Sequence, residues 1–179
     1  MSHVEITIRE ACIEDSGAIA AILHTLGWSE QLKREDPVQI QADIAARIEQ
    51  CVREQTHTIL VAERRRDGSN QSIGNTSPSC QVAQQVIGYI SVHWFPNMLM
   101  LGYDGYVSEL FIHPDETGLG AGSRLLETVQ AYAAERGCTR LLLMNRRIRE
   151  SYRRHFYVKH GWEELPDAAF FSLKLPVSA

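Results

Sequence analysis

The chain has 179 residues, of which 44% are hydrophobic and 22% are charged, and its formal net charge is −4. Length and composition are those of an ordinary globular protein with a sizeable core, and they predict a single domain over residues 1–179. The acidic balance argues against a general nucleic-acid binder, and no apolar run is long enough to span a membrane.

The first third of the chain predicts one strand followed by two helices. Apolar and polar residues alternate from Val4 to Arg9, which indicates a strand. Helix-start residues and apolar residues at helical spacing predict a helix over about 14–26. A second helix is expected to begin at Pro37, with Asp36 as its N-cap.

Three strands are expected next. Thr58–Ala62 and Val86–Trp94 are rich in β-branched and aromatic residues, and Tyr106–Ile112 is also strand-like. The stretch 65–84 is polar, with Gly, Ser, Asn and Pro throughout. We expect it to be a long hairpin loop, and a domain linker is the alternative.

The glycine run 118–122 separates the strand 106–112 from a helix-like stretch, Ser123–Arg136. The first amides of a helix have no partners within the helix, and the helix dipole makes this end positive. Because glycines let an anion approach the backbone, the run predicts a phosphate site. A plain tight turn is the alternative.

The rest of the chain predicts a strand at Arg140–Met144, a basic helix at Glu150–His160 and a final strand pair at 162–165 and 170–175. With the earlier elements, this order predicts an α/β (α+β) domain around one mixed sheet.

Two familiar phosphate motifs do not match the glycine run. A P-loop needs a lysine after the glycines, whereas Ser123 follows Gly122 directly. A dinucleotide fingerprint needs GxGxxG and an acidic residue after the next strand, whereas the run has GxGxG spacing and that strand ends at Met144-Asn145.

A third pattern fits better. Ile112-His113-Pro114 followed by 118–126 resembles the acetyl-CoA loop of the GNAT N-acetyltransferase superfamily, although Thr117 stands where Gln or Arg is usual. The stretch 156–162, Phe-Tyr-Val-Lys-His-Gly-Trp, is similar to a second motif of that family. The resemblance covers residues 4–175 in element order.

The resemblance implies a GNAT fold, with a mostly antiparallel sheet flanked by about four helices. It also implies direct acetyl transfer from acetyl-CoA, as co-substrate, to a primary amine of a small molecule, peptide or protein. A non-catalytic acyl-CoA-binding or regulatory domain is the alternative, because of Thr117. The implied cofactor-binding residues are Leu110, Phe111, Ile112, Thr117, Gly118, Leu119, Gly120, Ala121, Gly122, Ser123, Asn145, Arg149 and Tyr152.

Tyr157 stands at the family's position for the general acid. A thiolate has a free pKa of about 8.5 and a tyrosine about 10, so Tyr157 could protonate the leaving thiolate. The alternative is a core aromatic residue. A lysine-like amine has a pKa of about 10.4, so it needs help to lose its proton. Glu109 is the first candidate base and Asp104 the second, and the alternative for Glu109 is a solvent-facing charge.

The remaining expectations are less specific. Cations crowd the stretch 146–159 and are expected to contact the phosphates of CoA, or else to form a solvated face. By analogy with the family, specificity should depend on Trp28–Lys33 and Pro166–Phe170. Tyr89 is expected in the core, with a pocket wall as the alternative, and no histidine is assigned to catalysis.

The four cysteines are widely scattered and none has metal-ligand spacing, so no metal site is expected. Scattered cysteines without a signal peptide are typical of the reducing cytosol, and we expect a cytoplasmic protein. No nucleic-acid or membrane partner is expected, and a homodimer is plausible by analogy with the family.

Overall fold

The computed structural model describes residues 4–65, 84–173 and 175, so the expected loop 65–84 lies almost entirely outside the described residues. The chain divides into two compact units, Met1–Leu142 and Leu143–Ala179. The expectation of one domain over the whole chain stays a prediction.

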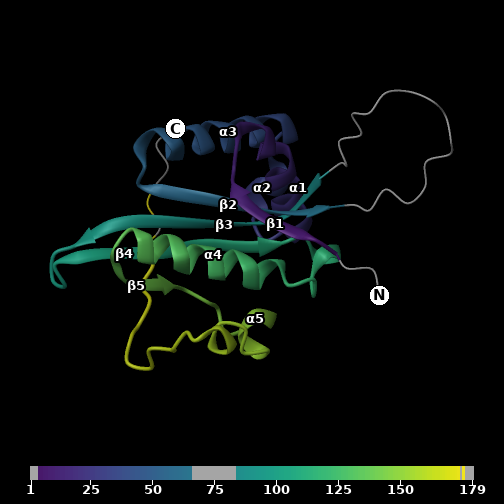
Figure 1. The fold of residues 1–179 in the computed structure, drawn as a ribbon. Coiled ribbons are helices and arrows are strands. Elements are labelled where there is room, and N and C mark those ends of the chain that lie inside the picture. The colour runs from purple at the N-terminus through teal and green to yellow at the C-terminus, as the bar shows by residue number, and fades with distance from the viewer. Residues whose placement is uncertain (1–3, 66–83, 174, 176–179) are drawn as a thin grey trace, which may run out of the picture. The chain divides into compact units, whose positions relative to one another are not determined.

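The first unit contains a five-stranded sheet with the order β1-β2-β3-β4-β5 (Figure 1). The first three neighbouring pairs are antiparallel. In β5, Thr139 lies beside Gly102 and Leu141 beside Gly105, so β5 runs parallel to β4 and the sheet is mixed, as predicted. The strands are Ile6–Glu10 (β1), His57–Arg65 (β2), Gln84–Asn97 (β3), Gly102–Ile112 (β4) and Cys138–Leu143 (β5).

Helices cover this sheet. The sequence predicted three of them closely, and the Asp36 side chain accepts a hydrogen bond from the Val38 amide as the expected N-cap. It did not predict α2, because five residues are too few to show a helical period. The helices of the first unit are Ser16–Leu26 (α1), Glu30–Arg34 (α2), Pro37–Glu54 (α3) and Ala121–Glu135 (α4).

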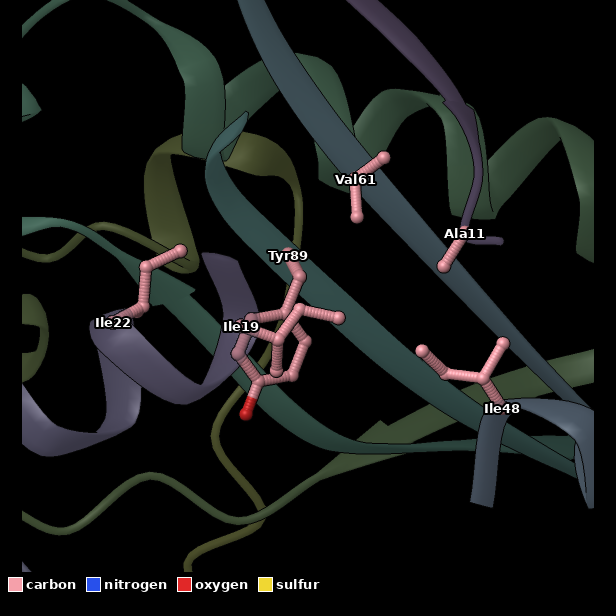
Figure 2. Packing of buried hydrophobic residues seen from close by; sticks show 6 residues of the cluster. All are labelled: Ala11, Ile19, Ile22, Ile48, Val61 and Tyr89. Carbon is pink, nitrogen blue, oxygen red and sulfur yellow. The ribbon is translucent and has the colours of Figure 1, made fainter. Parts of the chain in front are cut away.

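Both faces of the sheet are buried. Leu60, Val61 and Ala62 are consecutive in β2 and are all 0% exposed. Because neighbouring strand residues point to opposite faces, each face must be covered. The helices α1 and α3 pack on each other and on β2 and β3, and α4 packs across β1–β4 (Figure 1). Figure 2 shows the cluster on the α1–α3 side: Ala11, Ile19, Ile22, Ile48, Val61 and Tyr89.

The second unit differs from the sequence prediction. The expected helix Glu150–His160 is broken into α5, Glu150–Arg153, and a 3-10 turn, Val158–His160. His155 has a φ of 55°, a left-handed conformation that cannot continue a helix. The expected final strand pair is wrong, since the described residues of 162–165 and 170–175 form no strand. In 162–165, the adjacent Glu163 and Glu164 break the alternation of apolar and polar residues that a strand would show.

Asp104 ties three strands together. It is 1% exposed, and its carboxylate accepts hydrogen bonds from Asn97 at 2.6 Å and from Thr139 at 3.3 Å. The Arg140 guanidinium donates two further bonds at 3.0 and 2.9 Å and holds the pKa of the Asp104 carboxyl below its usual range. Asp104 is therefore a structural group, and Glu109 remains as the candidate base.

We expect Asp104→Asn to lower the free energy of unfolding by about 2 kcal/mol at pH 7, because charge-assisted hydrogen bonds to a buried carboxylate are lost. A folded-state pKa below the unfolded value contributes stability above the unfolded pKa of about 3.9, and this stability is lost as the pH falls through the folded pKa. Urea unfolding should therefore show the difference from wild type shrinking below about pH 4.

Glu49→Gln, an exposed change on α3, is the control and should leave stability nearly unchanged. An Asp104→Asn protein as stable as wild type at pH 7 would contradict the structural role of this carboxylate.

Candidate active site

A bulge in β4 determines which side chains face the α1–α3 side of the sheet. Ser91 pairs with Glu109, but the next pair is Val92 with Val107, so Ser108 is an extra residue on β4. In a regular strand, residues two apart share a face. The bulge instead puts Val107 in the core, at 4% exposure, while both Ser108 and Glu109 line one pocket.

This pocket has a volume of about 690 Å³ and lies between α1–α3 and strands β2–β4. Such a volume is typical of a site for a small molecule or an extended side chain. Its helix side is largely aliphatic and includes Ile19, Leu23, Leu32, Ile40, Ile44 and Ile48, with the charged Glu35, Asp43 and Arg47. Its sheet side carries His57, Ile59, Tyr89, Ser91, His93, Ser108 and Glu109.

Glu109 is half-buried in the pocket wall, so it is not a charge that faces open solvent. The Tyr89 hydroxyl donates a hydrogen bond to Glu109 Oε2 at 2.9 Å. Burial, and then the neighbouring Glu109 carboxylate, raise the pKa of Tyr89, so this hydroxyl keeps its proton at neutral pH. The pocket therefore contains an oriented carboxylate beside an aliphatic wall.

Two histidines that sequence reasoning left unassigned also line this pocket. His57 and His93 pair across β2 and β3, with ring centroids 4.1 Å apart. The Ser108 hydroxyl lies 3.0 Å from His93 Nε2 and 3.3 Å from the Ser91 carbonyl oxygen. Burial, and then His57, lower the pKa of His93. Only strand register, which a sequence does not display, brings these two rings together.

The predicted phosphate loop has the open geometry that the glycines suggested. Gly118 and Gly120 have φ values of 82° and 84°, which favour glycine, and a Cβ at either position would meet nothing within 4 Å. Gly120 is the N-cap of α4, and the first helical hydrogen bond runs from the Arg124 amide to its carbonyl at 3.1 Å. The amides of Ala121 and Gly122 precede that bond at the positive end of the helix.

Buried contacts fix the start of this loop. The Arg64 guanidinium on β2 lies 2.8 Å from the carboxylate of Glu116, which is 8% exposed and belongs to the 3-10 turn Pro114–Glu116. The Thr117 hydroxyl donates to the Pro114 carbonyl at 3.0 Å. Thr117 therefore stabilises the turn with its side chain and has only its backbone to offer to a phosphate.

The end of β4 leads directly from the pocket to the loop. Leu110, Phe111 and Ile112 pair with Ile90, Tyr89 and Gly88 of β3. Phe111 also packs edge-on against Trp28, with ring centroids 5.1 Å apart, and against Tyr89 at 5.7 Å. One strand thus carries the pocket carboxylate and the backbone expected to pair with the pantetheine arm.

The second unit carries the other predicted site residues. Tyr157 is half-buried between Phe156 and Trp162, with ring centroids 5.1 and 6.1 Å away, and burial raises the pKa of its hydroxyl. Asn145 accepts a hydrogen bond from Ser151 at 3.0 Å, and the Tyr152 hydroxyl donates to Glu164 at 2.9 Å.

Among the crowded cations, Arg147 pairs with Glu164 at 2.6 Å, and Arg149 is the N-cap of α5. In the part of the chain that the structure describes, no three His, Cys, Asp or Glu residues converge as metal ligands. No described helix combines the length and the apolar character that crossing a membrane requires.

This chain is similar to known proteins both in sequence and in structure. Thialysine N-epsilon-acetyltransferase from Bos taurus is 27% identical over 152 residues, which are 83% of this chain and 81% of that protein. A solved transcriptional regulator from Bacillus halodurans C-125 has a TM-score of 0.70 and 20% identity, and the match covers 96% of this chain and 100% of that one. Ribosomal-protein-alanine N-acetyltransferase from Brucella melitensis biovar Abortus 2308 has a TM-score of 0.63 and 18% identity, covering 96% and 100%.

The two solved structures have the same fold as this chain. The model of the acetyltransferase (GNAT) family matches residues 42–162, which is more than half of the chain. This protein therefore belongs to the GNAT family, and it is an N-acetyltransferase that transfers an acetyl group from acetyl-CoA to an amine.

Proposed function

We propose that the acceptor amine binds in the pocket between α1–α3 and strands β2–β4, and that Glu109 takes its proton, directly or through water. The observation that carries the proposal is an oriented carboxylate, half-buried beside an aliphatic wall. A carboxylate attracts an ammonium group, and aliphatic side chains suit the carbons behind it. The bovine relative is named as an acetyltransferase for the N-epsilon position of thialysine. This name supports an acceptor with a primary amine at the end of an aliphatic chain.

The chemistry follows from proton balance. The amine gives one proton to Glu109, and its free lone pair attacks the thioester carbonyl of acetyl-CoA. A carbon–nitrogen bond forms as the carbon–sulfur bond breaks. The thiolate then takes a proton from Tyr157, whose hydroxyl is protonated at neutral pH. The acetylated nitrogen loses its second proton as the amide forms, and this proton returns through water to the Tyr157 oxygen. The family match favours this enzyme over a non-catalytic acyl-CoA-binding domain.

Acetyl-CoA would lie along the other end of β4. The backbone from Gly118 to Ser123 would hold the pyrophosphate, with Thr117 contributing through its backbone, and Leu110–Ile112 would pair with the pantetheine arm. Asn145, Arg149 and Tyr152 are the proposed contacts from the second unit. We also propose that the protein is cytoplasmic and forms a homodimer.

Glu109→Gln should lower kcat/KM for the amine about 10²–10⁴-fold at pH 7, because the general base is lost. The dissociation constant for acetyl-CoA should not change. The deficit should shrink toward pH 10, since an amine with a pKa of about 10.4 is then partly neutral without help. Release of free thiol measures the rate, and Glu135→Gln on α4 is the control. A deficit that is constant from pH 7 to pH 10 would exclude the base role.

Gly120→Ala should weaken acetyl-CoA binding about tenfold or more, because the added methyl group would occupy the space proposed for a phosphate. Calorimetric titration with acetyl-CoA measures this. The matched control is Gly137→Ala at the far end of α4, where φ is 66° and a Cβ also meets nothing within 4 Å. Both variants place a Cβ on a backbone with positive φ, so equal affinities would refute the phosphate site.

Tyr157→Phe should reduce kcat about 10²-fold or more while acetyl-CoA affinity stays within about twofold, because only protonation of the leaving thiolate is removed. Tyr103→Phe, an exposed change in the β3–β4 hairpin, is the control. A Tyr157→Phe enzyme that turns over at the wild-type rate would remove Tyr157 from the acid role.

A further inference from the structure

Tyr89 holds Glu109 by one oxygen. Its hydroxyl donates to Glu109 Oε2 at 2.9 Å, and no other residue that the structure describes hydrogen-bonds to this carboxylate. Both residues line the same pocket. Since a carboxylate has two oxygens and Tyr89 engages Oε2, Oε1 is left for a ligand in the pocket.

The Tyr89 ring cannot easily move away from this contact. It is 2% exposed and belongs to the core cluster with Ile19 and Val61 (Figure 2). Phe111 packs edge-on against the Tyr89 ring, and Trp28 in turn packs edge-on against Phe111. A hydroxyl on a rigid, buried ring is therefore a fixed donor, whereas a glutamate side chain alone has several rotatable bonds.

A fixed donor matters for a general base because it selects one orientation of the carboxylate, and position is decisive for proton transfer. Other titratable groups line the same pocket, namely His57 on β2, His93 on β3, Glu35 between α2 and α3, and Asp43, Arg47 and Cys51 on α3. Tyr89 is the one that makes a direct hydrogen bond to Glu109.

We propose that Tyr89 is a positioning residue for acetyl transfer: it holds the Glu109 carboxylate in one orientation and aims its second oxygen at the acceptor amine. This inference rests on the proposed role of Glu109 as the base. The competing interpretation is a core tyrosine whose hydroxyl has merely found a partner.

Tyr89→Phe is the direct test, because it removes the hydroxyl and keeps the ring. The variant should lose about tenfold in kcat/KM for the amine. The loss should lie in kcat, with KM for the amine within about twofold of wild type, because the carboxylate still attracts the ammonium group but no longer keeps its position. Acetyl-CoA affinity should stay within about twofold. The matched control is Tyr132→Phe, which removes another tyrosine–glutamate hydrogen bond, to Glu10 at 3.3 Å, outside this pocket.

A double variant separates this proposal from the role of Glu109. If Tyr89 acts through Glu109, Tyr89→Phe should have no further effect in the Glu109→Gln background. Losses that multiply, or a folded Tyr89→Phe enzyme with wild-type kcat, would overturn the proposal. A Glu109→Gln enzyme with wild-type kcat/KM would instead refute the base itself. If Tyr89→Phe does not fold, Tyr89→Met is the second variant without the hydroxyl and is judged by the same change in kcat.

Discussion

The extra residue at Ser108 in β4 is the constraint on which the candidate site depends. Val107 and Glu109 are two residues apart, so a regular strand would turn both to one face. The bulge lets Val107 pack in the core beside Val92, while Glu109 lines the pocket opposite Ser91. A carboxylate at the core position of Val107, which is 4% exposed, would lose its contact with water at a cost in free energy. The bulge therefore places Val107 in the core and Glu109 in the pocket.

Tyr89 connects these two parts of the molecule. Its ring belongs to the apolar cluster that holds α1 and α3 on the sheet, and its hydroxyl reaches the pocket carboxylate. A residue packed in this way transmits the rigidity of the core to a side chain that needs a defined position. The pocket can then be open to an acceptor while its proposed base stays fixed.

The same strand then supplies the region proposed for the cofactor. From Glu109 the chain runs through Leu110–Ile112 into a turn whose buried Glu116 is paired with Arg64 of β2. This pair anchors the chain just before the glycines. The glycines must lack side chains so that a phosphate can approach the backbone, but they need not be mobile. A preorganised set of amides binds a phosphate at a lower entropic cost than a mobile loop does.

The sequence by itself determined the glycine loop, the long helices and the first five strands along the chain, because each leaves a local signal of period, composition, cap or missing side chain. The loop and the motif at 156–162 were also sufficient to suggest the GNAT family, which the family model confirms. Local signals failed where a partner decides the structure, as at 162–175, and where an element is as short as α2. Only tertiary structure made Asp104 a structural ion pair and set Tyr89 on Glu109. Cross-strand register and a one-residue bulge control both arrangements, and neither leaves a periodic trace in the chain.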